Sequence, residues 1–347
     1  MRWPLHHIGK PVLAGLALLV AWILWAAICA GAGGQPLALT SPYVAAPVGL
    51  GVGVAAGSFV ATRSSAPVVP LALMTLTGAL IVGVMWTDGP AKNPLGYANA
   101  NAALAVQLIG LSGLALLSQV GKRRILLALS AIGAFAVIVI NSSRAGIVVA
   151  IPLLVVVAVS AWRPTRRQRV AVIAGMAGLA VSTLAAAVIV SLAARDEWPN
   201  WATTAFDSAR RSLWHDAWQI WSTHLVFGVG PGNFERLSAL GHDSDTAAAH
   251  SSVLQVGAET GTVGVVLLGL TVVAGLLWAG RGRPAYAVVG AAAWTALLVH
   301  SLVDHLVDFP AIVVAGGMVI GWAGATTRES EELDIPQREG PVAHRRG

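Results

Sequence analysis

Residues 210–234 read RRSLWHDAWQIWSTHLVFGVGPGNF, and residues 249–264 read AHSSVLQVGAETGTVG. The segment from residue 210 to residue 264 holds four of the nine histidines and five Trp or Phe side chains, whereas long apolar runs lie on both sides of it. A chain that concentrates polar side chains in one loop between hydrophobic walls is expected to use that loop. The contrast between the loop and its flanks also decides the fold class.

The composition is that of a membrane protein. Of the 347 residues, 56% are hydrophobic and 11% are charged, whereas soluble domains carry about 25% charged residues. Several windows of about 20 residues contain no charge, and a helix of that length crosses a bilayer. The predicted fold class is therefore all-α, a polytopic helical membrane protein. The single cysteine, Cys29, excludes an internal disulfide framework and a cysteine-based zinc site.

Ten hydrophobic spans are predicted within one transmembrane domain over residues 1–325. They cover residues 11–31, 45–62, 67–86, 99–119, 125–141, 145–161, 170–193, 251–279, 284–303 and 309–325. The long loop 194–249 is predicted to be extracytoplasmic, and the polar tail 326–347 to be a disordered cytoplasmic segment. We expect the first span to be retained, because it is long for a signal peptide and Ile28 is bulky where a lipoprotein cleavage site needs a small residue.

The basic residues indicate the orientation of the spans. Together with both termini, the clusters around residues 63, 122–124, 163–169 and 281–283 put 16 of the 22 Lys and Arg residues on one side of the membrane. The positive-inside rule therefore places the termini in the cytoplasm and the 194–249 loop outside. Because the basic residues form such clusters between apolar runs, the net charge of +6 does not indicate nucleic-acid binding.

Residues 210–225 show a helical pattern within the loop. Apolar side chains recur with helical spacing at Trp214, Trp218, Trp221 and Leu225, and polar ones at Arg211, His215, Gln219 and Ser222. The pattern predicts an amphipathic helix whose aromatic stripe lies in the outer membrane interface. A plain surface-docked helix would explain the tryptophans equally well, but not the adjacent arginines.

Glycines dominate the turn that follows and the next span. The three glycines of the turn FGVGPGNF, residues 227–234, demand special backbone geometry, which favours a sharp corner, with anion binding as the alternative. Gly257, Gly261 and Gly264 in the eighth span are interpreted as positions of close helix packing.

Ionisable side chains at the membrane boundary are costly, so they tend to be paired or functional. Arg144 lies in a connection of about three residues, on the side where the positive-inside rule disfavours a snorkelling arginine, and we interpret it as functional. His250, at the start of the eighth span, is either structural or catalytic. Asp304, His305 and Asp308 either form ion pairs or contact a substrate.

Five short motifs outline the loop and its neighbouring spans. Arg210 precedes Trp214 by four residues, the turn follows at residues 228–234, and His250-Ser251 is followed, after nine residues, by Gly261-Thr262-Val263-Gly264. The other two are Ser-Arg-Ala-Gly at residues 143–146 and GYANANAA at residues 96–103. Together, and in their order along the chain, these motifs resemble the O-antigen ligase and polymerase superfamily of polytopic glycosyltransferases. The resemblance covers roughly residues 95–325, and family members often carry more spans than are predicted here.

The resemblance implies transfer or polymerisation of a polyprenyl-diphosphate-linked glycan onto an acceptor hydroxyl, outside the cytoplasmic membrane. Arg144 and Arg210 would hold the diphosphate with paired hydrogen bonds in place of a metal ion, and His250 would take up the hydroxyl proton. Direct attack would invert the anomeric carbon. The other residues expected to bind substrate are Arg211, Trp214, Gly230, Gly232, Asn233, Glu259 and Asp304. The implied partners are the lipid-linked donor, a glycan or lipid-glycan acceptor and membrane lipids, without nucleic acid or cofactor.

Three other interpretations of the sequence are weaker. A transporter or flippase of lipid-linked saccharides would need charges deep within its helices, and Glu259 is the clearest charge within a predicted span. A sensor or scaffold would not need the ordered set of motifs. His242, Asp243 and Asp245 with His250 could be metal ligands, but their spacing matches no standard site, so no metal is predicted.

Overall fold

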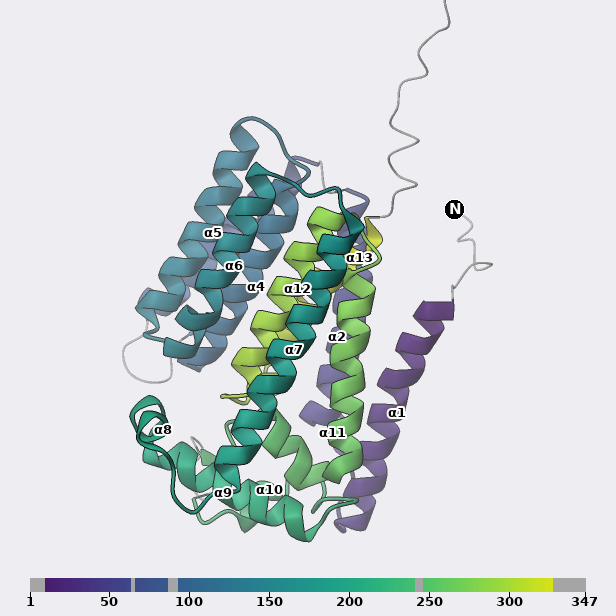
Figure 1. Cartoon of the computed structure of the whole chain (residues 1–347), viewed down its shortest axis with the longest axis vertical. Helices are drawn as coiled ribbons and strands as arrows, with labels where there is room; N and C mark the ends of the chain where they lie inside the picture. Colours follow the sequence, from purple (N-terminus) through teal and green to yellow (C-terminus); the bar gives the residue numbers. More distant parts are fainter. Residues whose placement is uncertain (1–9, 64–65, 87–92, 241–245, 327–347) are drawn as a thin grey trace, which may run out of the picture.

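The computed structural model of the chain describes residues 10–63, 66–86, 93–240 and 246–326, which are helical and contain no β-strand (Figure 1). The bundle consists of α1 (Lys10–Ala32), α2 (Pro42–Ala61), α3 (Val68–Met85), α4 (Ala98–Leu116), α5 (Lys122–Ile140), α6 (Arg144–Trp162), α7 (Gln168–Ala193), α11 (Ser252–Ala279), α12 (Pro284–Ser301) and α13 (Pro310–Ala325). Between α7 and α11 lie α8 (Asn200–Ala205), α9 (Ser208–Thr223) and α10 (Phe234–Leu237), and the short 3-10 helix η3 (Leu306–Asp308) precedes α13.

The polytopic helical fold class predicted from the composition is confirmed. A helix occurs at each of the ten predicted segments, and nine of the helices in the described part are long and apolar enough to cross a membrane. α13 is an apolar helix of 16 residues, shorter than these nine. The assignment of ten membrane crossings stays a prediction. The predicted tail lies outside the described residues, apart from Thr326.

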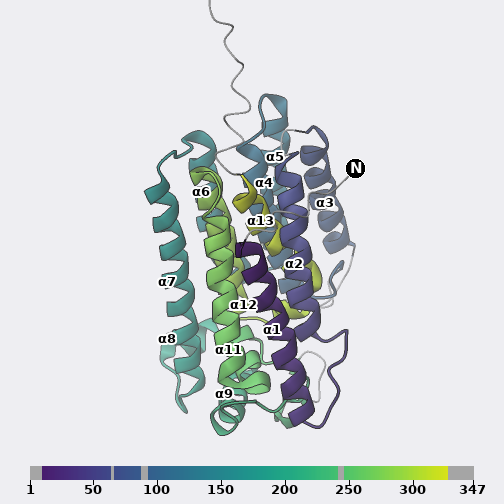
Figure 2. The same ribbon diagram turned by 90° about the vertical axis from the view of Figure 1, so that its right-hand side faces the viewer.

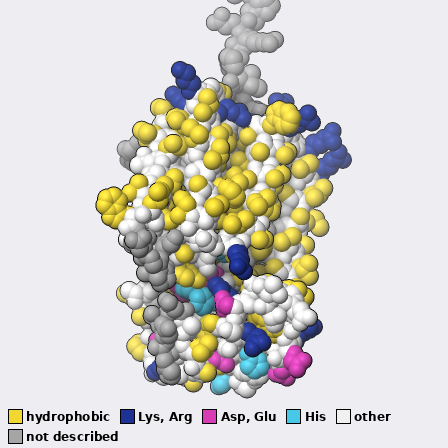
Figure 3. All heavy atoms as spheres, turned by 90° about the vertical axis from the view of Figure 1, so that its left-hand side faces the viewer, with side chains coloured by type: hydrophobic (Ala, Val, Ile, Leu, Met, Phe, Trp, Pro, Cys, Tyr) yellow, Lys and Arg dark blue, Asp and Glu magenta, His cyan; other side chains and the backbone are white. Residues whose placement is uncertain are grey.

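The two ends of the bundle differ in charge. The connections that carry the predicted cytoplasmic basic clusters, such as α6–α7 and α11–α12, lie at one end, and α8, α9 and α10 lie at the other (Figure 1). On the face drawn in Figure 3, Lys and Arg side chains gather at the first end, and His, Asp and Glu side chains mix with Lys and Arg at the second, below a hydrophobic band. The polar loop therefore covers one end of the bundle.

Small residues bring the helices together around an almost wholly buried α4. α2 crosses α13 so closely that a Cβ on Gly57 would lie 2.1 Å from the Met318 carbonyl oxygen, and glycine permits such an approach. α1 lies at the periphery beside α2 and α11 (Figure 2). At the end covered by the polar loop, η3 packs against α4 and α12, and α9 packs against α11.

Candidate active site

The helix predicted at residues 210–225 is α9, and it is docked on the bundle. Asp207 caps its first turn, because its side chain accepts a hydrogen bond from the Arg210 backbone N–H at 2.8 Å. The buried face packs against α7 and α11 and consists of Leu213, Trp214, Ala217 and Trp221. Two tryptophans of the predicted stripe are therefore inside the protein, because the bundle end offers them an apolar surface to pack against.

Trp214, which the resemblance assigns to substrate binding, is a buried support for His250. Its side chain is 0% exposed and lies against Trp198 and Phe206, with ring centroids 5.4 and 4.9 Å away. The indole N–H donates a hydrogen bond to the His250 carbonyl oxygen at 3.3 Å. A side chain without an exposed face cannot stack on a sugar, so the structure corrects the expected role of Trp214 to holding the backbone of His250.

The glycine-rich turn joins onto a break in α11. Gly261 has a φ of +67° and interrupts the helix, which frees carbonyl groups of the preceding turn. The backbone N–H groups of Val229 and Gly230 donate to the carbonyl oxygens of Ala258 and Glu259, both at 2.9 Å. The turn is therefore the sharp corner favoured by its sequence, and Gly261 is a close-packing position as predicted.

A carboxylate of the chain itself occupies N–H groups of this turn. Glu259 is 2% exposed, and its Oε1 accepts hydrogen bonds from the backbone N–H groups of Gly232 at 2.9 Å and Phe234 at 3.2 Å. The backbone of the turn thus forms a nest of N–H groups that holds the Glu259 carboxyl group. Gly230 and Asn233 are buried beside it, so they hold the turn and do not face a substrate as expected. Glu259, the ionisable residue within a span that a transporter would need, thus supports the turn.

Gly261→Ala is expected to destabilise the protein by more than about 1 kcal/mol. A Cβ at this position would lie 2.1 Å from the Val226 carbonyl oxygen, and its φ is strained for any residue with a side chain. Gly269→Ala in the same helix is the matched control, because no atom lies within 4 Å of its Cβ. Thermal unfolding of the purified variants in detergent compares them, and equal midpoints would show that the break in α11 is dispensable.

Two histidines and two polar side chains of α4 and its N-cap converge on the carboxylate of Asp304. The Nδ1 atoms of His250 and His305 lie 3.2 and 3.0 Å from Oδ1. The Tyr97 hydroxyl donates to both carboxylate oxygens at 3.0 Å, and the Asn99 amide donates to Oδ2 at 2.6 Å. His250 is 8% exposed and has a φ of +49°, a strained value for a residue other than glycine, and such strain gathers at functional sites.

The buried Asp304 is ionised and organises the cluster. Burial alone would raise the pKa of its carboxyl group, but hydrogen bonds from His250 and His305 hold that pKa well below its usual value. Burial and the neighbouring Asp304 raise the pKa of the Tyr97 hydroxyl, which therefore stays protonated and donates. Asp304 is 1% exposed, so the expectation that it contacts substrate is corrected to ion pairing, the alternative left open by the sequence.

Tyr97 and Asn99 belong to the cluster, although no site role is predicted for them. They lie in the stretch GYANANAA, which carries part of the family resemblance. Tyr97 is the N-cap of α4 and Asn99 lies in its first turn. The run of polar residues at the start of an apolar span could have indicated their role. A polar group that is buried there needs a hydrogen-bond partner in the protein.

Arg210 joins the cluster from α9. Its guanidinium forms an ion pair with Asp207, lies 3.6 Å from Oδ2 of Asp304, and donates from Nε to the Val303 carbonyl oxygen at 3.3 Å. Its side chain is 22% exposed. The structure thus brings Arg210 and His250, two of the predicted catalytic residues, to one carboxylate.

Arg144 in α6 and Arg211 in α9 are exposed cations. Arg144 is the first residue of α6, and the Ser143 side chain caps that helix by accepting the Gly146 backbone N–H at 3.1 Å. Within the described residues, neither arginine side chain forms a hydrogen bond or ion pair, and no contact links Arg144 to the Asp304 cluster. Both guanidinium groups are therefore accessible to a ligand at the surface of the protein.

Three atoms of the cluster have the spacing of metal ligands. Nδ1 of His250, Nδ1 of His305 and Oδ1 of Asp304 lie 3.0–3.3 Å from one another. Ligands of an ion with bonds of about 2.0–2.1 Å have a similar separation, so these residues could hold a metal. The spacing is equally that of a hydrogen-bonded cluster in which an imidazole N–H donates to Asp304. The alternative ligands at residues 242–245 lie outside the described residues.

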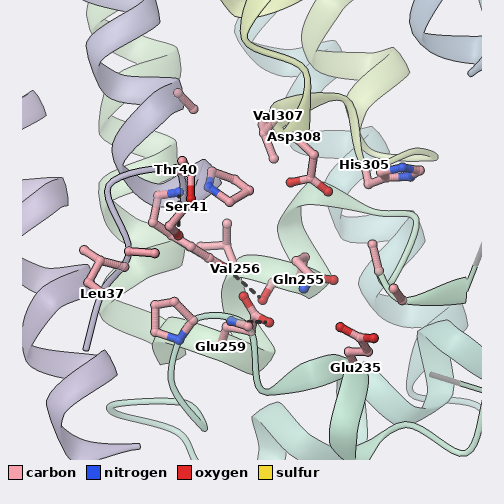
Figure 4. Close-up of a pocket in the computed structure, with 18 of the residues that line it drawn as sticks. Leu37, Thr40, Ser41, Glu235, Gln255, Val256, Glu259, His305, Val307 and Asp308 are labelled. Atoms are coloured by element: carbon pink, nitrogen blue, oxygen red, sulfur yellow. Dashed lines mark hydrogen bonds between the residues drawn. The ribbon is translucent and has the colours of Figure 1, made fainter. Parts of the chain in front are cut away.

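An open chamber of about 560 Å³ adjoins His250 and His305. Its walls are the α1–α2 connection, the segment before α10, η3 and the N-terminal part of α11 (Figure 4). Its polar lining residues include Gln35, Thr40, Ser41, Gly232, Glu235, Gln255, Glu259 and Asp308. Gly232 in the turn and Glu259 in α11, both expected to bind substrate, thus border this open space.

A region of the chain that includes part of this site matches a known family. Residues 126–269 match the family model described as O-antigen ligase. The matched residues include Arg144, Arg210 and His250, whereas Tyr97 and Asp304 lie outside them. A search of the curated proteins found no match to the chain.

Proposed function

Over residues 126–269 the chain belongs to the O-antigen ligase family, and from this premise we propose that it transfers a polyprenyl-diphosphate-linked glycan to an acceptor hydroxyl at the outer face of the cytoplasmic membrane. The family makes it a membrane enzyme of O-antigen ligase or polymerase type in cell-surface polysaccharide assembly. The observation that best supports glycan transfer is that Nδ1 of His250 and a guanidinium nitrogen of Arg210 lie 3.2 and 3.6 Å from the carboxylate oxygens of the same buried residue, Asp304. A base and a cation held together are what transfer from a diphosphate requires.

In this proposal the arginines hold the donor. A diphosphate is a good leaving group, so the site mainly has to stabilise its charge, and a guanidinium offers paired N–H donors to phosphate oxygens. Arg210 makes this contact, with Arg144 and Arg211 supplying further charge. The half-exposed Asp207 gives up its ion pair with Arg210 to the diphosphate, while Asp304 keeps the guanidinium in position from the buried side.

His250 takes the proton of the attacking hydroxyl. Because its Nδ1 faces Asp304, Nε2 is the nitrogen that accepts this proton. The acceptor oxygen bonds to the anomeric carbon while the bond from that carbon to the diphosphate oxygen breaks, and the electron pair of the broken bond leaves with the diphosphate. A single displacement inverts the anomeric carbon. The arginines supply the positive charge, so the proposal uses no metal ion.

Arg210→Lys and Arg144→Lys are each expected to lower the transfer rate by about 10- to 150-fold, because one charge-assisted contact contributes about 1.5–3 kcal/mol. Lysine keeps the charge but loses the paired donors. The measurement uses the purified full chain in nanodiscs with a lipid-linked glycan donor, and records donor binding and turnover separately. In this assay strong chelators should leave the wild-type rate unchanged.

Arg195→Lys is the matched control for both arginines, since Arg195 is an exposed cation of the same loop outside the cluster. It should keep the wild-type rate. Full activity in Arg210→Lys would remove Arg210 from the donor site. Activity that chelators abolish and Mg²⁺ or Mn²⁺ restores would contradict metal independence and assign His250, Asp304 and His305 to an ion.

The proposed orientation predicts the outcome of reporter fusions. Alkaline phosphatase joined after Ser208 should be active, because this residue begins α9 at the end of the bundle assigned to the outside. Fusions after Arg124 and Arg283, at the opposite end, should be inactive and serve as the matched controls. If the Ser208 fusion is inactive and the Arg124 and Arg283 fusions are active, the Asp304 cluster lies in the cytoplasm, and this result would contradict transfer at the outer face.

A further inference from the structure

The chamber beside His250 differs in charge from the surface that carries the arginines. It borders both histidines of the cluster, and three carboxylates line it, those of Glu235, Glu259 and Asp308. No Lys or Arg is among its lining residues in the described part of the chain. Arg236 lies beside the chamber, where its guanidinium bonds to Asn233 and lies within hydrogen-bond distance of the side-chain amide of Gln35. A diphosphate would find no guanidinium or ammonium group among the described residues that line this cavity, whereas the surface at Arg210 provides one.

Its remaining polar groups suit sugar hydroxyls. Thr40 and Ser41 offer hydroxyl groups and Gln255 offers the N–H groups of its amide, while Trp22 adds an aromatic ring. A cavity of this volume is in the range of small-molecule sites, which combine apolar walls with a few polar groups that fix orientation. The lining is that of a site for an uncharged polar ligand with many hydroxyl groups.

Asp308 is the carboxylate best placed to contact such a ligand. In Figure 4 its side chain points into the chamber from η3, toward that of Glu235 on the opposite wall. Burial raises the pKa of the Asp308 carboxyl group, and the side chain forms no hydrogen bond or ion pair with any described residue. A partly buried carboxyl group without a hydrogen-bond partner in the described protein is costly, and a hydroxyl-bearing ligand would provide the missing hydrogen bonds.

We propose that this chamber binds the acceptor glycan, and that the acceptor sugar held there is uncharged or carries an amino group. Its hydroxyls donate to Asp308 and Glu235, and the attacking hydroxyl lies at His250. The donor diphosphate remains on the other side of the histidine, at Arg210. This inference rests on the proposed glycan transfer and adds the acceptor subsite and the charge class of the acceptor.

The test compares Asp308→Asn and Glu235→Gln with Glu197→Gln, whose carboxylate is exposed in the polar loop and does not line the chamber. The full chain in nanodiscs receives a lipid-linked glycan donor and the radiolabelled glycolipid fraction of the same cells as acceptor. The first two variants are expected to raise the acceptor KM about 10-fold or more, as expected for a lost hydrogen bond to a charged group. Donor affinity should stay within about twofold of wild type, and Glu197→Gln should match wild type throughout.

Two results overturn the inference. The chamber is not the acceptor subsite if both chamber variants behave like Glu197→Gln, or if they weaken donor binding and leave the acceptor KM unchanged. In either case, transfer by wild type would still support the proposed function. A preferred acceptor whose reacting sugar carries a phosphate or carboxylate overturns the charge class. Conversely, binding of the glycolipid that depends on Asp308, without transfer by wild type, would support the subsite and refute the transferase. Glu235 is exposed, so its variant reports even if Asp308→Asn does not fold.

Discussion

His250→Ala is expected to lower the turnover of glycan transfer by about 10²–10⁴-fold, the usual contribution of a positioned general base. The side chain borders the chamber, and its Nδ1 is held 3.2 Å from the buried Asp304, so alanine removes the group that takes up the hydroxyl proton. Donor affinity should change little, since the diphosphate contacts belong to the arginines. Single-turnover rates and donor binding, measured on the same purified protein, separate the two effects.

Two further variants show whether this loss is specific. His224→Ala is the matched control, because His224 is an exposed histidine at the end of α9 and takes no part in the Asp304 cluster. It should retain wild-type turnover. His305→Ala distinguishes the two histidines bound to Asp304. A near-normal rate in His250→Ala together with a large loss in His305→Ala would transfer the role of base to His305.

Asp304→Asn is expected to destabilise the protein by about 3–5 kcal/mol, because removing one partner of a buried ion pair leaves the other charge uncompensated. The new amide N–H groups would face donors from Tyr97, Asn99 and Arg210 where the carboxylate now accepts or pairs. Turnover should fall by at least about 10²-fold as well, since His250 loses the group that orients it. Chemical unfolding in detergent and the transfer assay measure the two effects.

The stability difference should depend on pH in a defined direction. The folded-state pKa of Asp304 is depressed, so its contribution is fully present above the unfolded value of about 3.9 and is lost as the pH falls through the lower folded value. The difference in stability between wild type and Asp304→Asn should therefore be full at neutral pH, and it should shrink progressively as the pH falls below about 4. Asp196→Asn, at an exposed loop carboxylate, is the control. A constant difference down to acidic pH would show that Asp304 is not ionised in the folded protein.

Composition and periodicity were enough to predict the helices. Long uncharged runs have few alternatives to a membrane-spanning helix, so the segments were readable from residue type alone. The spacing of Trp214, Trp218, Trp221 and Leu225 likewise predicted α9, because helix periodicity is a local property. What the local pattern could not decide was the surface that this apolar face meets, and the structure places it against α7 and α11.

Only the tertiary structure decided which polar residues form the site. Tyr97, His250 and Asp304 are far apart in the chain and meet because α4, α11 and the α12–α13 connection end at the same face. Burial then separated the motif residues by role. Glu259 and Trp214 are inside, where a polar group must be satisfied by the protein itself, while Arg144 and Arg211 are exposed. A motif records which residue types occur in order, but hydrogen bonding and burial depend on neighbours that the order along the chain does not specify.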